Sequence, residues 1–265
     1  MQKNIIHHLF FVIFIIACGC FTDRDSGAEA AGNGTAGGTP STVYFRDDFN
    51  GTEGDSSVWQ IATWSEHGGQ TGTERCYIDD GKLTLVFRNE SGTYLSSAIQ
   101  TRKEYLYGKW EARLKPSNVA GILNSMYTID WDDMSTATSS SDGTKQEIDI
   151  EFLTKSFSGT DGQVHFAVHA SGKTSFNLNP DLDLGFDPSA DFHVWAIEIT
   201  AERINWYVDG KLLHTYLYSS GININGPYQL KLNAWTAVDW IGGPPAANVD
   251  CIYQIDWIQF TPSAE

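Results

Sequence analysis

The chain has 265 residues, 41% of them hydrophobic, which suffices for one large β-rich domain or two small domains. Its 17 Lys and Arg against 33 Asp and Glu give a net charge of −16, which argues against nucleic acid as a partner, because binding phosphates requires a basic face. Nine Trp, eleven Tyr and fourteen Phe are compatible with a surface that stacks on sugar rings, although most of these rings will belong to the core.

Residues 1–20 are typical of a lipoprotein export signal. Lys3 supplies a positive charge, and the apolar run from Ile5 to Ala17 is too short to span a bilayer, which needs about 20 residues. The run ends in Ile-Ile-Ala-Cys, which resembles a bacterial lipidation box with Cys18 as the acylated residue. Cys20 is the alternative site, and an ordinary cleaved secretory signal is the alternative mechanism. We therefore expect an exported protein, held by a lipid to a membrane of the cell envelope, at the outer membrane or cell surface.

Residues 21–41 are rich in Gly and Ala and have no apolar period, so they predict a flexible tether. The folded domain is then expected over residues 42–265. It contains two cysteines, Cys76 and Cys251. Export permits a disulfide between them, and two free buried thiols are the alternative.

From residue 42 onward, short runs of β-branched and aromatic residues alternate with turn signals. The runs are 82–87, 108–115, 121–129, 163–169, 193–200, 203–208, 211–214, 228–235 and 252–260. Asp209-Gly210 between two of them predicts a hairpin, because a type I′ turn needs positive φ at both central residues. No stretch shows a sustained helical period, so we expect an all-β sandwich of antiparallel sheets in one domain.

The segment 146–152 carries the candidate chemistry. As a strand it places Glu147, Asp149 and Glu151 on one face and three apolar residues on the other. Like charges raise one another's pKa, so a strand selected for stability alone would avoid such a row. A solvent-facing acidic edge that discourages aggregation is the alternative interpretation.

The same row suits retaining glycoside hydrolysis, which uses a carboxylate nucleophile and a protonated carboxyl about 5–5.5 Å away. Cα atoms four residues apart on a strand are separated by roughly 13 Å, so the side chains of Glu147 and Glu151 must lean toward each other. Asp149 between them can share a proton with one glutamate and raise the pKa of the other, which then acts as the acid.

The sequence Glu-Ile-Asp-Ile-Glu-Phe resembles the catalytic signature of glycoside hydrolase family 16. It is similar to the subgroup without a bulge residue in this strand, which holds the bacterial lichenases and the plant xyloglucan endotransglycosylases. Other segments resemble the family in the same order, namely 107–111, 184–188, 192–193, 206–210, 232–235, 239–240 and 253–257. The resemblance covers about residues 47–261 and implies a concanavalin-like jelly roll with a concave substrate cleft.

By this resemblance Glu147 is the nucleophile, Asp149 the assisting carboxylate and Glu151 the acid/base. The residues implied to line the cleft and bind sugars are Tyr127, His165, Asn233, Trp235 and Trp240. Ordinary packing is the alternative for the aromatic members. No cofactor is implied for catalysis.

A structural calcium ion is also implied by the resemblance. Asp256 is similar to the family's calcium ligand on the convex side, with the carbonyl of Gly81 as its partner. An aspartate on the last strand could equally cap a turn.

Several positions depart from the lichenase pattern. Ala98 and Gln100 stand where an acidic residue and an arginine line the donor side, Lys145 replaces a tryptophan, and Ala167 replaces an asparagine. A polar loop, 135–141, precedes the catalytic strand and is expected to reshape the cleft rim. Each replacement removes a hydrogen-bonding or stacking partner, so the reaction type follows from the resemblance better than the linkage does.

The resemblance therefore implies a monomeric, retaining endo-β-glucanase whose partner is a polysaccharide, with mixed-linkage 1,3-1,4-β-glucan as the best guess. The alternatives are a xyloglucan-active hydrolase or transglycosylase, a β-1,3-glucanase and, outside the enzyme class, a glycan-binding lectin. The three acids disfavour the lectin, because sugar binding needs aromatic rings and amides but no such row.

Overall fold

The computed structural model describes residues 43–51, 54–65, 67–130, 146–170, 173–236 and 238–263. The predicted signal (1–20), the tether (21–41) and the polar loop (135–141) lie outside the described residues. So do Cys18, Cys20 and Lys145.

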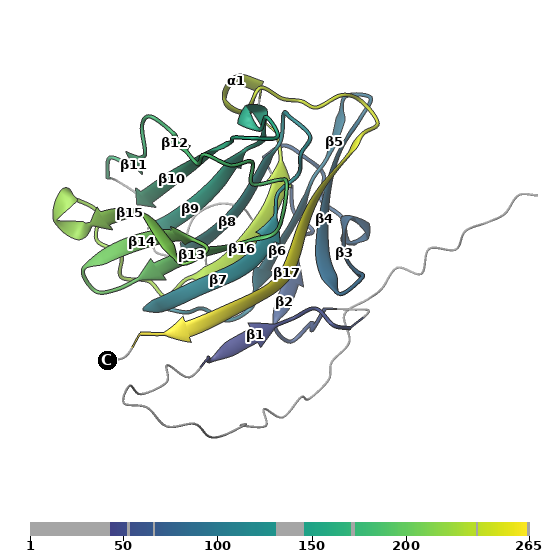
Figure 1. The fold of residues 1–265 in the computed structure, drawn as a ribbon. Helices are drawn as coiled ribbons and strands as arrows, with labels where there is room; N and C mark the ends of the chain where they lie inside the picture. Colours follow the sequence, from purple (N-terminus) through teal and green to yellow (C-terminus); the bar gives the residue numbers. More distant parts are fainter. Residues whose placement is uncertain are drawn as a thin grey trace, which may run out of the picture.

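One sheet of nine strands forms one of the two layers of the fold (Figure 1), and we call it the convex sheet after the jelly roll that the sequence implies. Its strands are β1 (Phe45–Asp47), β3 (Cys76–Asp79), β4 (Lys82–Glu90), β5 (Thr93–Leu95), β7 (Gly108–Lys115), β13 (His193–Ile199), β14 (Arg203–Val208), β15 (Lys211–Leu217) and β17 (Asp250–Pro262). Their order is β15-β14-β13-β7-β17-β4-β3, with β1 paired to β17 and β5 paired to β4.

A second sheet of eight strands packs against the first and carries the segment 146–152 near its centre. Its strands are β2 (Trp59–Ile61), β6 (Ser97–Thr101), β8 (Leu123–Asp130), β9 (Gln146–Leu153), β10 (Gln163–Ala170), β11 (Phe176–Asn177), β12 (Leu182–Asp183) and β16 (Gln229–Trp235). Their order is β11-β10-β9-β8-β16-β6-β2, with β12 paired to β10. Helical structure in the described residues is limited to the short elements η1 (Thr73–Arg75), η2 (Thr154–Ser156), η3 (Tyr218–Ser220) and α1 (Val238–Ile241). The predicted all-β sandwich of antiparallel sheets is confirmed.

The longer predicted runs all coincide with strands, and two of them, 108–115 and 203–208, have the predicted bounds. The strands that no run predicted are mostly the shortest ones. The strands β1 and β2 have three residues each, and β11 and β12 have two each, which is too short to display an alternating pattern.

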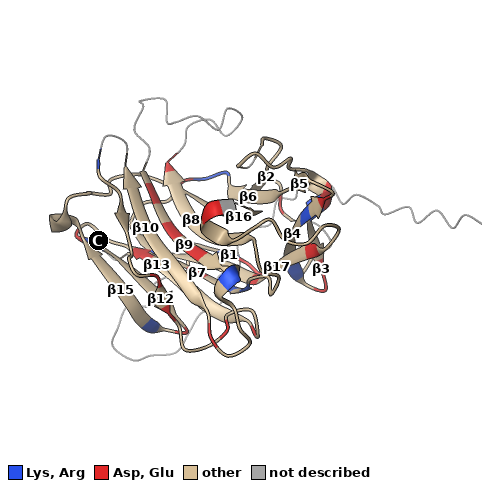
Figure 2. Ribbon diagram, turned by 90° about the horizontal axis from the view of Figure 1, so that it is seen from above, with Lys and Arg blue, Asp and Glu red and all other residues tan. Residues whose placement is uncertain are grey.

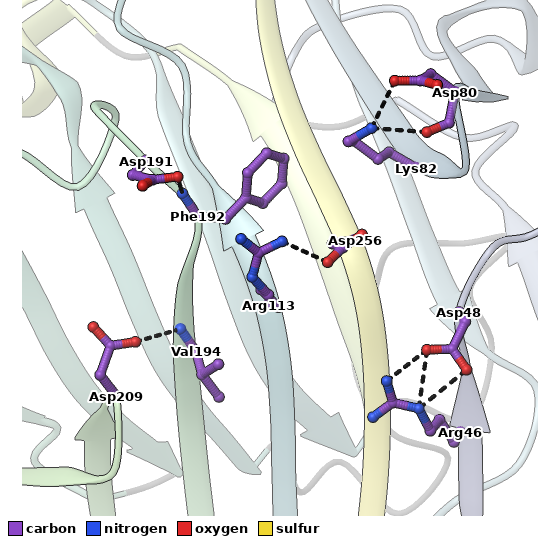
Figure 3. Close-up of polar contacts among 10 residues, drawn as sticks. All are labelled: Arg46, Asp48, Asp80, Lys82, Arg113, Asp191, Phe192, Val194, Asp209 and Asp256. Atoms are coloured by element: carbon purple, nitrogen blue, oxygen red, sulfur yellow. Dashed lines mark hydrogen bonds and ion pairs between the residues drawn. The ribbon is translucent and has the colours of Figure 1, made fainter.

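The predicted Asp-Gly hairpin joins β14 to β15. Asp209 has φ of 48° and Gly210 has φ of 76°, as a turn of the I′ kind requires. The carboxylate of Asp209 also accepts a hydrogen bond from the backbone N–H of Val194 at 2.9 Å (Figure 3). The turn is thereby fixed to the neighbouring strand β13.

The core lies between the two sheets and supports the strand β9 from behind. Ile148, Ile150 and Phe152 are fully buried there, and the ring of Phe152 packs edge-on against Trp195 with centroids 4.8 Å apart. Trp206 on β14 donates a hydrogen bond from its indole Nε1 to the backbone carbonyl of Asp149 at 3.0 Å. The convex sheet therefore holds the middle of β9 through both packing and a directed hydrogen bond.

The two cysteines of the domain are free and buried, so the alternative of unpaired thiols is the one observed. Cys76 lies on β3 and Cys251 on β17, and both strands pair with β4 from opposite sides. Two strands so placed are separated by roughly 9–10 Å, whereas a disulfide needs Cα atoms about 4.4–6.8 Å apart. Burial raises the pKa of Cys251 to about 12 and also raises the pKa of Cys76.

Candidate active site

The register of the eight-stranded sheet arranges its outward side chains in rows that run across the strands. We call this outward surface the cleft face. Residues directly opposite each other on antiparallel strands point to the same side of the sheet. One row contains Ala167, Asp149, Tyr127, Lys231 and Gln100, and the next contains His165, Glu151, Ser125, Asn233 and Ala98. A third row contains His169, Glu147 and Ile129.

The three acids occupy adjacent rows on the central strand β9. Figure 2 shows the acidic residues spaced along this strand, between β8 and β10. Asp149 is only 3% exposed, whereas Glu147 and Glu151 are partly exposed. The buried carboxylate therefore lies between two carboxyl groups that solvent or a ligand can reach.

A pocket of about 350 Å³ lies on the β10 side of the acid row. It is lined by Glu151, His165, His169, Asn177 and Trp240. His165 Nδ1 lies 2.6 Å from Asp181 Oδ1, and the imidazole packs edge-on against Trp240 with centroids 5.4 Å apart. The pocket brings the predicted residues His165 and Trp240 together with the predicted acid/base Glu151.

The other side of the acid row contains the predicted residues Tyr127 and Asn233. Ser125 donates its hydroxyl hydrogen to the amide oxygen of Asn233, and the Asn233 amide donates to the hydroxyl of Tyr127 at 3.3 Å. Both predicted residues are largely buried, so they form part of the floor of the cleft face.

Trp235, also predicted, follows on the same strand two residues after Asn233. It is half-buried, and its indole stacks on His67 with ring centroids 3.8 Å apart. The five predicted substrate-binding residues thus all lie on or beside the cleft face, two of them on the pocket side and three on the other.

Four residues of this surface were missed by the sequence analysis: His67, Trp64, His169 and Lys231. Lys231 is 1% exposed, and its ammonium lies over the rings of Trp64 (5.1 Å) and Tyr127 (5.5 Å). His169 lies 3.4 Å from Asp149, measured from Nε2 to Oδ2. Strand periodicity could have indicated both, since His169 is four residues after His165 and Lys231 is two before Asn233. Trp64 and His67 lie between β2 and β6, outside any strand of this sheet. No pattern in the sequence marks them.

The predicted calcium ligands lie on the convex sheet, and their surroundings do not fit a calcium site. The Asp256 carboxylate pairs with the Arg113 guanidinium at 2.6 Å (Figure 3). Gly81 lies in the β3–β4 turn, where Lys82 pairs with Asp80. Calcium requires six to eight oxygen ligands, and the described residues contain no cluster of three or more His, Cys, Asp or Glu suited to a metal. The Asp256 carboxylate is instead engaged by an arginine, which does not suit a calcium ligand.

Chemically, the site offers two partly exposed carboxyl groups and a buried carboxyl group between them, beside a pocket lined by a carboxyl, two imidazoles, an amide and an indole. A nucleophile and an acid/base on one strand face are what double displacement at a glycosidic carbon requires. The sandwich fold and this row are those of a glycoside hydrolase.

Comparison with known proteins identifies the family. The model of "Glycosyl hydrolases family 16" matches residues 63–259. A β-glucanase of Paenibacillus polymyxa is 32% identical over 217 residues, which cover 78% of this chain and 83% of that protein. The chain belongs to glycosyl hydrolases family 16. Hydrolases of this family retain anomeric configuration and need no catalytic cofactor.

Solved structures agree with this assignment. A prokaryotic β-1,3-1,4-glucanase (lichenase) from a mouse hindgut metagenome superposes with a TM-score of 0.66 at 25% identity, over 83% of this chain and 99% of that chain. The laminarinase catalytic domain of Thermotoga maritima superposes with a TM-score of 0.69 at 22% identity, over 84% and 98% of the two chains, and so shows the shared fold.

Proposed function

We propose that this protein is an endo-β-glucanase that hydrolyses internal β-glycosidic bonds of a polysaccharide with retention of configuration. The observation that carries the proposal is the row Glu147, Asp149 and Glu151 on the cleft face of β9. Relatives named β-glucanase, lichenase and laminarinase support the substrate class.

In the proposed mechanism Glu147 attacks the anomeric carbon while Glu151 gives its proton to the departing glycosidic oxygen. A covalent glycosyl ester on Glu147 results. Glu151, now a carboxylate, removes a proton from water, and the hydroxide formed displaces Glu147 and regenerates both groups. Proton NMR in the first minutes of digestion should therefore show the β-anomer of the new reducing end. An α-anomer appearing first would contradict the residue roles.

Mixed-linkage 1,3-1,4-β-glucan is the substrate that we propose. The named relatives include both lichenases and laminarinases, and Ala98 and Gln100 differ from the lichenase pattern, so β-1,3-glucan is the second candidate and xyloglucan the third. Digests of barley glucan, lichenan, laminarin and xyloglucan, with products sized by chromatography, decide among them. The proposal predicts the highest kcat/KM on barley glucan and lichenan; faster cleavage of laminarin or xyloglucan would contradict it.

For localisation, we propose export and lipidation at Cys18, with residues 21–41 as a tether between the membrane and a monomeric catalytic domain. This rests on the sequence pattern of residues 1–41. The helices in the described part of the chain include none long and apolar enough to cross a membrane. Cys18→Ala should move the protein from the membrane fraction to the soluble fraction. Unchanged membrane association of that variant would contradict lipidation at Cys18.

A further inference from the structure

We propose that His169 is a positioning residue of the catalytic row, whose imidazolium pairs with Asp149 and places a positive charge beside Glu147 at acidic pH. The inference rests on the proposed hydrolase function of this site. It adds a fourth group, on the neighbouring strand β10, to the three acids of β9.

The first observation is how His169 approaches the acids. In the β9–β10 register His169 lies opposite Glu147, and Ala167 lies opposite Asp149. His169 Nε2 nevertheless lies 3.4 Å from Asp149 Oδ2, so the imidazole leans diagonally across the small Ala167 side chain. A protonated His169 is therefore an ion-pair partner of Asp149 and a cross-strand neighbour of Glu147.

The second observation is what holds the ring. His169 Nδ1 lies 2.7 Å from Ser175 Oγ. A serine hydroxyl can donate a hydrogen bond to the nitrogen of a neutral imidazole or accept one from an imidazolium. Ser175 therefore keeps the ring in place in both charge states, which lets the charge change without moving the side chain.

The third observation is the charge around His169. The carboxyl groups that face it are Glu147 and Asp149 from β9, and Glu151 across the pocket. The other pocket imidazole, His165, is directed to Asp181 at 2.6 Å. Beyond β9, Lys231 on β16 lies under the rings of Trp64 and Tyr127. On the β10 side of the acids, His169 is thus a cation in direct contact with the catalytic row, through Asp149.

This geometry has a defined consequence for the pH dependence of catalysis. The carboxylates that face His169 favour its imidazolium form, so we expect a cation there across the acidic range. A nearby cation favours the ionised form of a carboxyl group. The acidic limb of kcat/KM reports ionisation of the nucleophile, so His169 should place that limb at lower pH. Once the imidazole is neutral it exerts no such effect, so the basic limb should depend on it less than the acidic limb does.

The test is the pH profile of kcat/KM for His169→Gln on the best soluble β-glucan. We expect the acidic limb to move up by about 0.5–1 pH unit, a modest shift because His169 is partly exposed, and the basic limb to move less. His169→Lys should restore the acidic limb and lower the basic limb, because its charge persists above pH 7. His193→Gln, which removes an imidazole from the convex sheet beside Asp209, should leave both limbs unchanged.

An acidic limb of folded His169→Gln that coincides with that of the wild type would overturn the inference. So would a His169→Lys profile equal to that of the Gln variant, since it would show a packing role instead of a charge role. His169→Asn serves as the neutral variant if the Gln variant does not fold.

The role of His169 can also be measured without any turnover. A wild-type protein that cleaves no β-glucan would refute the proposed function. Carbon-13 NMR of the labelled side-chain carboxyls would then measure the same titrations without turnover. His169→Gln should raise the pKa of the Asp149 carboxyl group, with which His169 pairs, and identical titrations in both proteins would refute the role of His169.

Discussion

At the scale of residues, the site places two accessible carboxyl groups around a buried one. The backbone carbonyl of Asp149 accepts from Trp206 behind the sheet, and its carboxylate faces His169 on the cleft face. Asp149 is therefore fixed from both sides of β9, while Glu147 and Glu151 remain partly exposed to a substrate. This division suits one orienting group and two reacting groups.

The roles of the two glutamates predict different responses to substitution. Glu147→Gln removes the nucleophile and should abolish turnover of every substrate. Glu151→Gln should lower kcat on polysaccharide by roughly 10²- to 10⁴-fold, because the leaving oxygen loses its proton donor. On an activated aryl glycoside, whose leaving group needs no proton, Glu151→Gln should retain much of the rate of glycosyl-ester formation. Near wild-type turnover of polysaccharide by either variant would refute the role of the substituted residue. Circular dichroism checks that each variant is folded.

A second residue-scale prediction concerns stability and pH. His214 stacks on Phe176 with centroids 5.5 Å apart, and burial lowers its pKa. The unfolded chain then takes up a proton near pH 6.5, where the folded protein does not, so stability is lost as the pH falls through this value. His214→Phe should make the melting temperature depend less steeply on pH between 7 and 5.5. Equal slopes for the variant and the wild type would contradict the prediction.

At the scale of elements, the strand β9 shows how alternation serves both stability and chemistry. Its inward residues are fully buried among the aromatic residues of the convex sheet, and its outward residues are the acids. Burying a large apolar side chain stabilises a fold by about 1.5–3 kcal/mol, which helps offset the repulsion of three acids on the opposite face. The catalytic row is therefore tolerated because the other face of the same strand is strongly anchored.

Truncating this anchor should have a large effect. Phe152→Ala leaves a cavity beside Trp195 and should lower the free energy of unfolding by about 3–5 kcal/mol, as judged by urea denaturation. Leu212→Ala, at a position half exposed on β15, is the matched control and should cost much less. A cost for Phe152→Ala no larger than that of the control would mean that the packing behind β9 is not what stabilises it.

At the scale of the whole molecule, ion pairs between side chains link neighbouring strands of the convex sheet. Arg113 on β7 pairs with Asp256 on β17, and Arg88 on β4 pairs with Asp250 on β17. These pairs are partly exposed, so each contributes little stability. Their importance here is that Arg113 occupies the carboxylate that the family resemblance assigned to calcium.

We therefore predict that the stability of the protein does not depend on calcium. A ligand stabilises the folded state only to the extent that it binds there, so the melting temperature should differ by less than about 1 °C between millimolar calcium and EDTA. Arg113→Met frees the Asp256 carboxylate and tests whether the arginine is what excludes the ion. A rise of several degrees on adding calcium to the wild-type protein would contradict the prediction.

Much of this protein is determined by local sequence. Runs of β-branched and aromatic residues between turn signals predicted the long strands. The side-chain period of two put Glu147, Asp149 and Glu151 on one face of their strand. The Asp209-Gly210 turn was likewise predictable, because its positive φ values are a local property of those residue types. The resemblance of Glu-Ile-Asp-Ile-Glu-Phe to a catalytic signature indicated the reaction class before any contact was known.

What only the tertiary structure decided are the contacts between segments far apart in the chain. Sheet order and register bring Lys231 beside Tyr127 and His169 beside Asp149, and no local pattern encodes which strands become neighbours. The same is true of Cys76 and Cys251, which β4 keeps apart, and of Asp256, whose partner proved to be Arg113. Strand-to-strand register is fixed by burial of the entire core at once, so the identity of each side chain's neighbours emerges only when all the strands are in place.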